Sequence, residues 1–280
     1  MVVNTLPVST LQGEKAVADY QTIKYEIRNG AAWVTLYRPD ALNAVSLELL
    51  NELDHAMDAA EADPQIRVFV VTGTGRAFCA GADLKRVRDA TVGRETGGMD
   101  SFLSRFMAVC VRLEQLPMPV VAAVNGLALA GGLELVLCCD LVVAAESAKL
   151  GDAHANYGLV PGAGGSVRLP RKIGQTRASY LMFTAEFVPA AELVDAGLVN
   201  FVVPDSELVA AVDGLVAKMA NKSPLGLARM KRLVLDGLEM PKHEALRAEI
   251  LTNNLHSKSE DMQEGLTAFK EKRAPNYTGR

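Results

Sequence analysis

The stretch that decides the fold is Pro119–Glu134, which reads PVVAAVNGLALAGGLE. It begins with Val120–Val124, an apolar run typical of a strand buried on both faces. The small residues Gly131 and Gly132 follow, where a ligand can approach the backbone closely. A helix is then expected over about Leu133–Cys138. Because a helix start leaves backbone N–H groups without partners inside the helix, this turn can offer hydrogen-bond donors.

A second segment, Phe78–Leu84, reads FCAGADL and has the same layout. It follows Ile66–Thr72, another apolar and β-branched run that predicts a buried strand. Two such turns can aim N–H donors at one oxygen that gains charge during a reaction, which is the geometry of an oxyanion hole. Glu134 lies three positions past Gly131 in an otherwise apolar stretch, so a carboxylate accompanies the donors.

The rest of the chain alternates strand and helix signals. Asn29-Gly30 is the strongest short hairpin signal, and it lies between predicted strands at Thr22–Arg28 and Ala31–Tyr37. Other expected elements are a helix capped by Ser46 and running to about Ala62, a helix over about Asp100–Gln115, and strands at Leu141–Ala145 and Leu198–Val203. This alternation predicts α/β layering with parallel strand pairing in the first two-thirds, followed by a helical appendage.

Composition and charge exclude several classes of protein. The chain has 280 residues and is 49% hydrophobic, which suits a large core in one domain or two. A net charge of −4 and an aromatic content of 5% give no electrostatic or stacking basis for binding nucleic acid. No signal peptide is expected, and no charge-free apolar run reaches about 18 residues, so no membrane span is expected either. The expected location is cytoplasmic.

The four cysteines are Cys79, Cys110, Cys138 and Cys139. No pair has the Cys-x-x-Cys spacing of many metal and redox sites, and the adjacent pair falls in an apolar stretch. We therefore expect small core residues in a reducing compartment, and no metal ligands or disulfides.

The motifs of this chain resemble those of the crotonase (enoyl-CoA hydratase/isomerase) superfamily. The resemblance runs from about residue 22 to Tyr277 and its elements occur in family order. They are Arg38-Pro39 with Leu42-Asn43-Ala44, Ala77–Asp83, Pro119–Gly126, Gly131–Glu134, Pro161–Gly165 and Phe269–Arg273. Each motif is weak alone, and the ordered set of six carries the resemblance.

The resemblance implies an α/β fold, namely a crotonase-type superhelix of ββα units with a C-terminal helical trimerisation region. The expected divisions are an N-terminal tail over residues 1–20, a ββα core over 21–200 and a C-terminal helical region over 201–280. The implied partners are an acyl-CoA substrate and copies of the same chain, as a homotrimer or a dimer of trimers. No metal or redox cofactor is implied, because coenzyme A enters as part of the substrate.

By the same resemblance, the backbone N–H groups of Ala82 and Gly131 hold the thioester carbonyl oxygen. That oxygen becomes enolate-like, so donors placed there stabilise the transition state more than the ground state.

The coenzyme A portion corresponds to Ala41, Ala80, Ala82, Leu84 and Lys85. Phe269 and Lys272 match positions that reach the coenzyme A of a neighbouring subunit in some relatives. The alternatives are core packing for Phe269 and a solvated helix face for Lys272.

Glu134 corresponds to the first of two glutamates that act as acid and base in family hydratases. The alternative is a carboxylate that backbone N–H groups satisfy. The second glutamate position is occupied here by His154, which can still transfer protons near neutral pH. The alternative for His154 is a structural histidine bonded to a neighbour such as Asp152. Gly162 matches a position whose N–H helps to hold the reactive water.

The leading expectation is an enoyl-CoA hydratase-like lyase that works through an enolate. The histidine leaves open other reactions of the superfamily that would use His154: double-bond isomerisation, decarboxylation of an acyl-CoA, or hydrolysis of a carbon–carbon bond. A further alternative is an acyl-CoA-binding protein that has lost its chemistry.

Overall fold

The structure is a computed structural model that describes residues 20–83 and 98–280. The larger sheet has six strands in the order β1-β2-β3-β5-β7-β10. Their bounds are β1 Ile23–Arg28, β2 Ala31–Leu36, β3 Val68–Gly73, β5 Val120–Val124, β7 Leu141–Ala145 and β10 Phe201–Val203. From β2 onward all neighbouring strands are parallel, and only the β1–β2 hairpin is antiparallel. The predicted α/β class with parallel pairing is confirmed.

The smaller sheet has four short strands in the order β4-β6-β8-β9. They are β4 Ala77–Cys79, β6 Leu127–Leu129, β8 Lys149–Gly151 and β9 Val188–Pro189. The chain therefore places β5 in the larger sheet, turns a corner into β6 in the smaller one, and continues into α4, Gly131–Leu137. At that corner a Cβ on Gly126 would lie 2.3 Å from the carbonyl oxygen of Arg76, so only glycine fits. This is one ββα unit of the expected superhelix.

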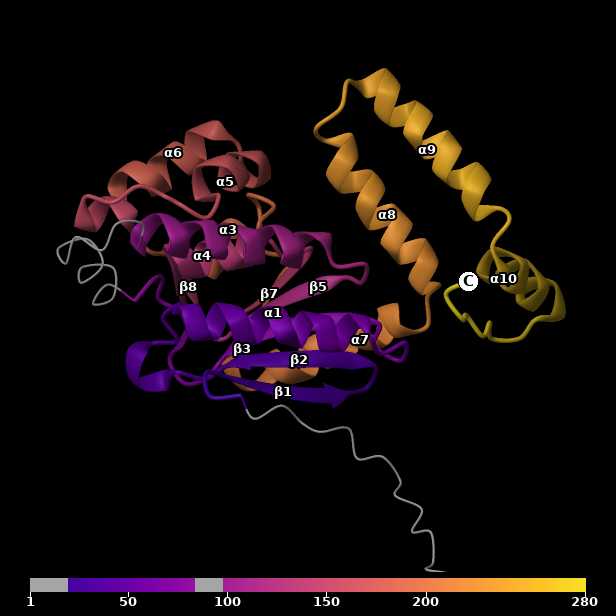
Figure 1. Cartoon of the computed structure of the whole chain (residues 1–280), viewed down its shortest axis with the longest axis horizontal. Coiled ribbons are helices and arrows are strands. Elements are labelled where there is room, and N and C mark those ends of the chain that lie inside the picture. The colour runs from indigo at the N-terminus through magenta and orange to yellow at the C-terminus, as the bar shows by residue number, and fades with distance from the viewer. Residues whose placement is uncertain (1–19, 84–97) are drawn as a thin grey trace, which may run out of the picture.

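Two helices cover opposite faces of the larger sheet (Figure 1). Helix α1, Leu47–Glu61, lies on the face toward which Tyr25 points. The ring of Tyr25 packs against Tyr20, and the Tyr20 hydroxyl forms a hydrogen bond with Nδ1 of His55 on α1 at 2.7 Å. Helix α7, Leu208–Ala220, lies on the other face, where Arg28 reaches Asp213 at 3.4 Å. Tyr25 and Arg28 point to opposite faces because side chains alternate along a strand.

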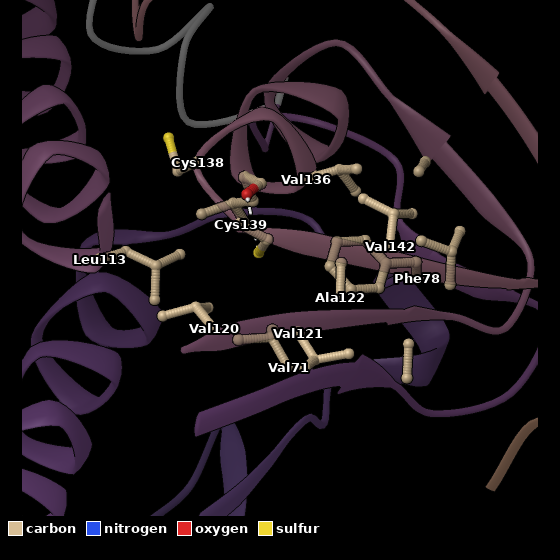
Figure 2. Packing of buried hydrophobic residues seen from close by; sticks show 14 of the residues in the cluster. Val71, Phe78, Leu113, Val120, Val121, Ala122, Val136, Cys138, Cys139 and Val142 are labelled. Carbon is tan, nitrogen blue, oxygen red and sulfur yellow. Dashed lines mark hydrogen bonds between the residues drawn. The ribbon is translucent and has the colours of Figure 1, made fainter. Parts of the chain in front are cut away.

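Helix α3, Gly98–Gln115, packs beside α1 and over the core. Figure 2 shows part of this core, to which α3, α4 with the two residues after it, the larger sheet and β4 of the smaller sheet contribute Val71, Phe78, Leu113, Val120, Val121, Ala122, Val136, Cys138, Cys139 and Val142. All four cysteines are buried free thiols, as predicted. Burying each large apolar side chain stabilises the fold by about 1.5–3 kcal/mol relative to leaving it exposed.

The hairpin turn and the helix cap predicted from the local sequence are both confirmed. Asn29 and Gly30 both have positive φ, 52° and 77°, as a two-residue type I′ hairpin requires. The side chain of Ser46 accepts a hydrogen bond from the N–H of Leu49 at 3.2 Å and so caps α1. The strand expected at Leu198–Val203 is shorter in the structure, where only Phe201–Val203 pairs with β7.

The remaining elements are short 3-10 helices and the helices that follow the core. The 3-10 helices are η1 Pro39–Ala41, η2 His154–Tyr157, η3 Ala190–Leu193 and η4 Asp205–Glu207, and the helices are α5 Gly165–Ile173, α6 Gln175–Thr184, α8 Pro224–Gly237, α9 Lys242–His256 and α10 Glu260–Glu271. Helices α8 to α10 extend away from the sheets (Figure 1), and no residue of α8 or α9 is buried. The predicted helical final third is confirmed.

The predicted N-terminal tail, except for Tyr20, lies outside the described residues. Within residues 20–83 and 98–280, no helix has the length and apolar character needed to cross a lipid bilayer.

Candidate active site

The two glycine-rich turns identified in the sequence lie against each other. Parallel pairing of β4 with β6 aligns Ala77 with Leu127 and Cys79 with Ala128, so the turns that follow both strands emerge side by side. A Cβ on Gly132 would lie 1.9 Å from the carbonyl oxygen of Cys79, which leaves no room for a side chain. The absence of a side chain therefore sets how closely the turns approach.

The backbone nitrogens of Ala82 and Gly131 are close neighbours. A Cβ built on Gly131 would lie 3.5 Å from the nitrogen of Ala82, and one built on Gly81 would lie 3.4 Å from the nitrogen of Gly131. Gly81 itself has a φ of 104°, a left-handed conformation that favours glycine. The structure thus brings together the two donors named from the sequence.

Neither N–H group donates to the backbone of the residues that the structure describes. The parallel bridge between Val45 and Ala82 joins the N–H of Val45 to the carbonyl of Gly81 at 2.8 Å, and the N–H of Asp83 to the carbonyl of Val45 at 3.1 Å. The N–H of Ala82 consequently points away from Val45. Gly131 is the first residue of α4, so its N–H has no acceptor in a preceding turn.

Glu134 is 3% exposed and rises from α4 toward the loop between η2 and α5. Its Oε1 accepts hydrogen bonds from the N–H of Ala163 at 2.8 Å and from the N–H of Gly165 at 2.9 Å. Its Oε2 makes no hydrogen bond to the residues that the structure describes. Burial raises the pKa of Glu134, the two N–H donors lower it, and the net pKa lies above its usual range.

His154 lies at the start of η2 and is 9% exposed. Its Nδ1 is 3.1 Å from Oδ1 of Asp152, which is itself buried. The contact is an ion pair without the alignment of a good hydrogen bond. Burial lowers the pKa of His154, but Asp152 and then Glu134 raise it, and the net pKa is raised. Asp152 and Glu134 therefore both act to favour the protonated ring.

The backbone between Asp152 and His154 is sharply turned. Ala153 has a φ of 60°, a left-handed conformation that costs an alanine about 1–2 kcal/mol. The carbonyl of Gly151, the residue before Asp152, accepts a hydrogen bond from the N–H of Ala130 at 3.0 Å. This bond ties the segment that carries His154 to the second glycine-rich turn.

Gly162 lies in the loop that faces Glu134. A Cβ on Gly162 would lie 2.6 Å from Cδ2 of Leu103 on α3, so this part of the loop packs tightly on α3. The hydrogen bonds to Glu134 come from Ala163 and Gly165, which lie in the same glycine-rich segment as Gly162 and were not among the predicted site residues. The glycine run Pro161–Gly165 was the available signal, because it marked a place where backbone approaches something closely.

Of the residues expected to bind coenzyme A, only some lie near the first glycine-rich turn in the part of the chain that the structure describes. Ala41 ends η1, and the N–H of Ala80 donates to the carbonyl of Leu42 in the following loop at 3.0 Å, so this region borders the first turn. Leu84 and Lys85 lie outside the described residues.

Phe269 and Lys272 lie on or next to α10, which Figure 1 places apart from α4. Phe269 is 86% exposed, so it is not a core residue of this chain. Lys272 follows α10 as its left-handed C-cap. Neither residue meets the site within one chain.

Comparisons with known proteins point to one family. The family model described as enoyl-CoA hydratase/isomerase matches residues 26–280. A probable enoyl-CoA hydratase of Mycobacterium bovis is 37% identical, over 93% of this chain and 99% of its own. A crotonyl-CoA hydratase of Syntrophomonas wolfei is 35% identical, over 92% and 98% of the two chains.

Solved structures show the same fold. The crystal structure of an enoyl-CoA hydratase from Bacillus anthracis superposes with a TM-score of 0.87 at 38% identity, covering 93% of this chain and all of that one. That of an enoyl-CoA hydratase from Mycobacterium smegmatis gives a TM-score of 0.85 at 33% identity, over 92% and 99% of the two chains. From its motifs, its ββα architecture and these relatives, the chain belongs to the enoyl-CoA hydratase/isomerase family, in the crotonase superfamily.

Proposed function

We propose that the protein hydrates the α,β-double bond of an enoyl-CoA thioester. The observation that carries the proposal is that a carboxylate, Glu134, and an imidazole, His154, both lie near the turns that carry the N–H groups of Ala82 and Gly131. An acid, a base and an oxyanion site are the three groups that addition of water to a conjugated thioester needs. The names of the relatives support the same reaction.

In the proposed reaction Glu134 is the general base. Two N–H groups hold its Oε1, so Oε2 is available to take a proton from water while the hydroxide oxygen bonds to Cβ. Because burial raises the pKa of Glu134, the ionised carboxylate is a stronger base than one in water. Electrons move from the double bond to the thioester oxygen, where the N–H groups of Ala82 and Gly131 stabilise the developing enolate.

His154 is the proposed general acid. Its imidazolium gives a proton to Cα as the enolate collapses, which forms a 3-hydroxyacyl-CoA with one water added. Asp152 supports this role because a buried anion favours the protonated ring. The site is reset when the proton that Glu134 has taken up passes to His154, either directly or by release to solvent with uptake of another proton by His154. Coenzyme A enters this reaction only as part of the substrate.

The test is steady-state hydration of a panel of enoyl-CoA esters by the wild type and Glu134→Gln. We expect turnover on at least one ester and a loss of about 10²- to 10⁴-fold in kcat for the variant, the usual contribution of a positioned acid or base. An unimpaired variant, or no wild-type turnover on any chain length, contradicts the proposal.

The Asp152–His154 pair favours one second candidate, another enolate reaction of the superfamily such as decarboxylation, isomerisation or carbon–carbon hydrolysis. His154→Glu separates the two. If hydratase activity appears only in this variant, the native reaction is one of the alternatives. Binding of CoA esters without turnover of any of them would instead indicate a non-catalytic protein.

We also propose that the chain works as a homotrimer or a dimer of trimers. The support is the set of large apolar side chains left exposed on α8, its C-cap residue Leu238, α9 and α10, which are Met230, Val234, Leu238, Leu246, Ile250, Leu251, Leu255, Leu266 and Phe269. Exposed apolar surface on this scale is typical of a protein interface. Light scattering coupled to size exclusion should give a mass of three or six chains, and a monomer at all concentrations contradicts the proposal.

A further inference from the structure

Ala163 is hydrogen-bonded through both of the peptide groups that meet at its Cα. Its N–H, in the peptide group shared with Gly162, donates to Oε1 of Glu134 at 2.8 Å, and its carbonyl oxygen, in the next peptide group, accepts from Nη1 of Arg168 at 2.9 Å. The peptide group that Arg168 holds is planar and lies between the two peptide groups whose N–H groups bind Glu134, those of Ala163 and Gly165. Turning it changes the backbone dihedral angles on either side, so the directions of both N–H groups depend on where the Arg168 guanidinium lies.

Arg168 is itself held in place by α3. Its Nε and Nη2 donate to the carboxylate of Glu114, at 3.2 Å and 2.9 Å respectively. The Arg168 side chain is 13% exposed, and this paired geometry fixes the plane of the guanidinium as well as its position. The contact connects α3 to α5 across the loop that faces Glu134.

The loop backbone fits around the guanidinium. Gly164 has a φ of 102°, and a Cβ on it would lie 1.9 Å from Nη1 of Arg168. The next residue, Gly165, supplies the second N–H to Glu134, and a Cβ on it would lie 3.2 Å from Oε1. The backbone of residues Ala163 to Gly165 thus lies in close contact between the Arg168 guanidinium and the Glu134 carboxylate.

We propose that Arg168, held by Glu114, is a positioning residue that aims the Ala163 N–H at Glu134 and so sets the orientation of that carboxylate. Naming Glu134 as the base rests on the proposed function, whereas the mechanical connection does not. Arg168 makes no hydrogen bond to Glu134 and acts only through the backbone of the loop, whose adjacent peptide groups carry the two bonds. The simpler role, anchoring α5 to α3 without effect on the site, predicts a loss of stability alone.

The chain offers a matched control. Arg171 lies on the same helix, forms an ion pair with Glu239 at 3.0 Å, and donates to the carbonyl of Val167 rather than to the site loop. Arg171→Met therefore removes an arginine and an ion pair from α5 without touching Ala163.

The first readout is the ionisation of Glu134, followed by ¹³C NMR on protein with labelled glutamate carboxyls and assigned with Glu134→Gln. Hydrogen bonds from N–H groups favour the charged form, so misdirecting one raises the pKa of the carboxylate. The charges of His154 and Asp152 also shift the pKa of Glu134, and every variant keeps both residues. We expect the Glu134 titration to move to higher pH in Arg168→Met and Glu114→Gln, and to stay in place in Arg171→Met.

The second readout is kinetic. Displacing a catalytic group by about 1 Å can cost on the order of 10²-fold in rate, so we expect kcat to fall about 10- to 100-fold in the two site variants. The KM for the CoA ester should change little, since the interaction lost is one with the base. Arg168→Lys keeps the charge but cannot bridge both partners, so an intermediate kcat is expected.

Two results overturn the inference: a folded Glu114→Gln or Arg168→Met with the Glu134 titration of the wild type, or an Arg171→Met that shifts it equally. If Arg168→Met does not fold, Glu114→Gln decides, because it keeps Arg168 and nearly the same side-chain volume. The titration needs no turnover. A shifted titration in a protein that hydrates no enoyl-CoA would therefore support the positioning role and contradict the proposed function.

Discussion

Oδ1 of Asp152 lies 3.1 Å from Nδ1 of His154, and both side chains are buried beside Glu134. A buried carboxylate without a partner is costly, so the pair stabilises the protonated ring. The position that corresponds to a second carboxylate in the two-glutamate hydratases thus carries an imidazole whose pKa is raised.

Asp152→Asn should lower the pKa of His154, because the variant removes the anion that raises it. An acid must be protonated to act, so the alkaline limb of the kcat/KM profile should move to lower pH. Measuring kcat/KM across the pH range for both proteins checks this, with Asp152→Glu as the variant that keeps the charge. An alkaline limb that stays in place would show that His154 is not the acid.

The same pair predicts how stability depends on pH. The folded-state pKa of His154 is raised, so its contribution is fully present below the unfolded value of about 6.5 and is lost as pH rises through the folded pKa. Urea unfolding of the wild type over this window should show a falling free energy of unfolding. His154→Gln should lack that component, and identical pH dependence of the two proteins would contradict the ion pair.

Gly132→Ala should destabilise the fold and disturb the oxyanion site together. The added Cβ would overlap the carbonyl oxygen of Cys79 at 1.9 Å, and backbone must move to relieve this contact. Overpacking of this kind costs about 1–3 kcal/mol, and displacement of the turn should lower kcat by on the order of 10²-fold.

Gly214→Ala on α7 is the control, because a Cβ there meets nothing within 4 Å. It should stabilise the protein by up to about 1 kcal/mol, the helix preference of alanine over glycine. Thermal unfolding and kcat of both variants check the pair. A wild-type kcat in folded Gly132→Ala would argue against a role for the close approach of the turns.

Asp261→Asn should release the C-terminal segment. Asp261 is 1% exposed and accepts hydrogen bonds from the Ser223 hydroxyl at 2.5 Å and from the N–H groups of Thr278 and Gly279 at 2.8 and 3.0 Å. Burial raises the pKa of Asp261, but these hydrogen bonds together lower it by more, so the net pKa is depressed. Its stabilisation is therefore present above about pH 3.9 and lost as pH falls through the folded pKa.

Amide hydrogen exchange at Thr278 and Gly279 measures this release directly. Exchange should be faster in Asp261→Asn, whereas Glu260→Gln, a change at the exposed neighbour, should leave it as in the wild type. Equal protection in both variants would show that other contacts hold the segment.

The sequence predicted the elements whose signals are local. The strands Val120–Val124 and Leu141–Ala145 have the predicted bounds, and the Asn29-Gly30 hairpin has the expected turn. The three-residue strands β4 and β6 were not predicted, because three residues show no periodicity and are strands only through their pairing in the folded sheet. Their pairing is what brings Ala82 close to Gly131.

The candidate site was predictable only in part for a related reason. The two turns and Glu134 could be found from local pattern, whereas His154 was found through the family motif. The donors to Glu134 lie 29 and 31 residues further along the chain, and the Glu114–Arg168 contact spans 54 residues. Contacts at such separations follow from the assembled fold, which no local window of sequence contains.

The central claim is addition of water at Cβ with Glu134 as the base, and product analysis by mass spectrometry tests it most directly. We predict that the wild type converts an enoyl-CoA to a product heavier by one water, and that equal amounts of Glu134→Gln form it about 10²- to 10⁴-fold more slowly. A product of unchanged mass, loss of carbon dioxide from a carboxylated ester, or cleavage of a β-diketone would contradict hydration as the native reaction.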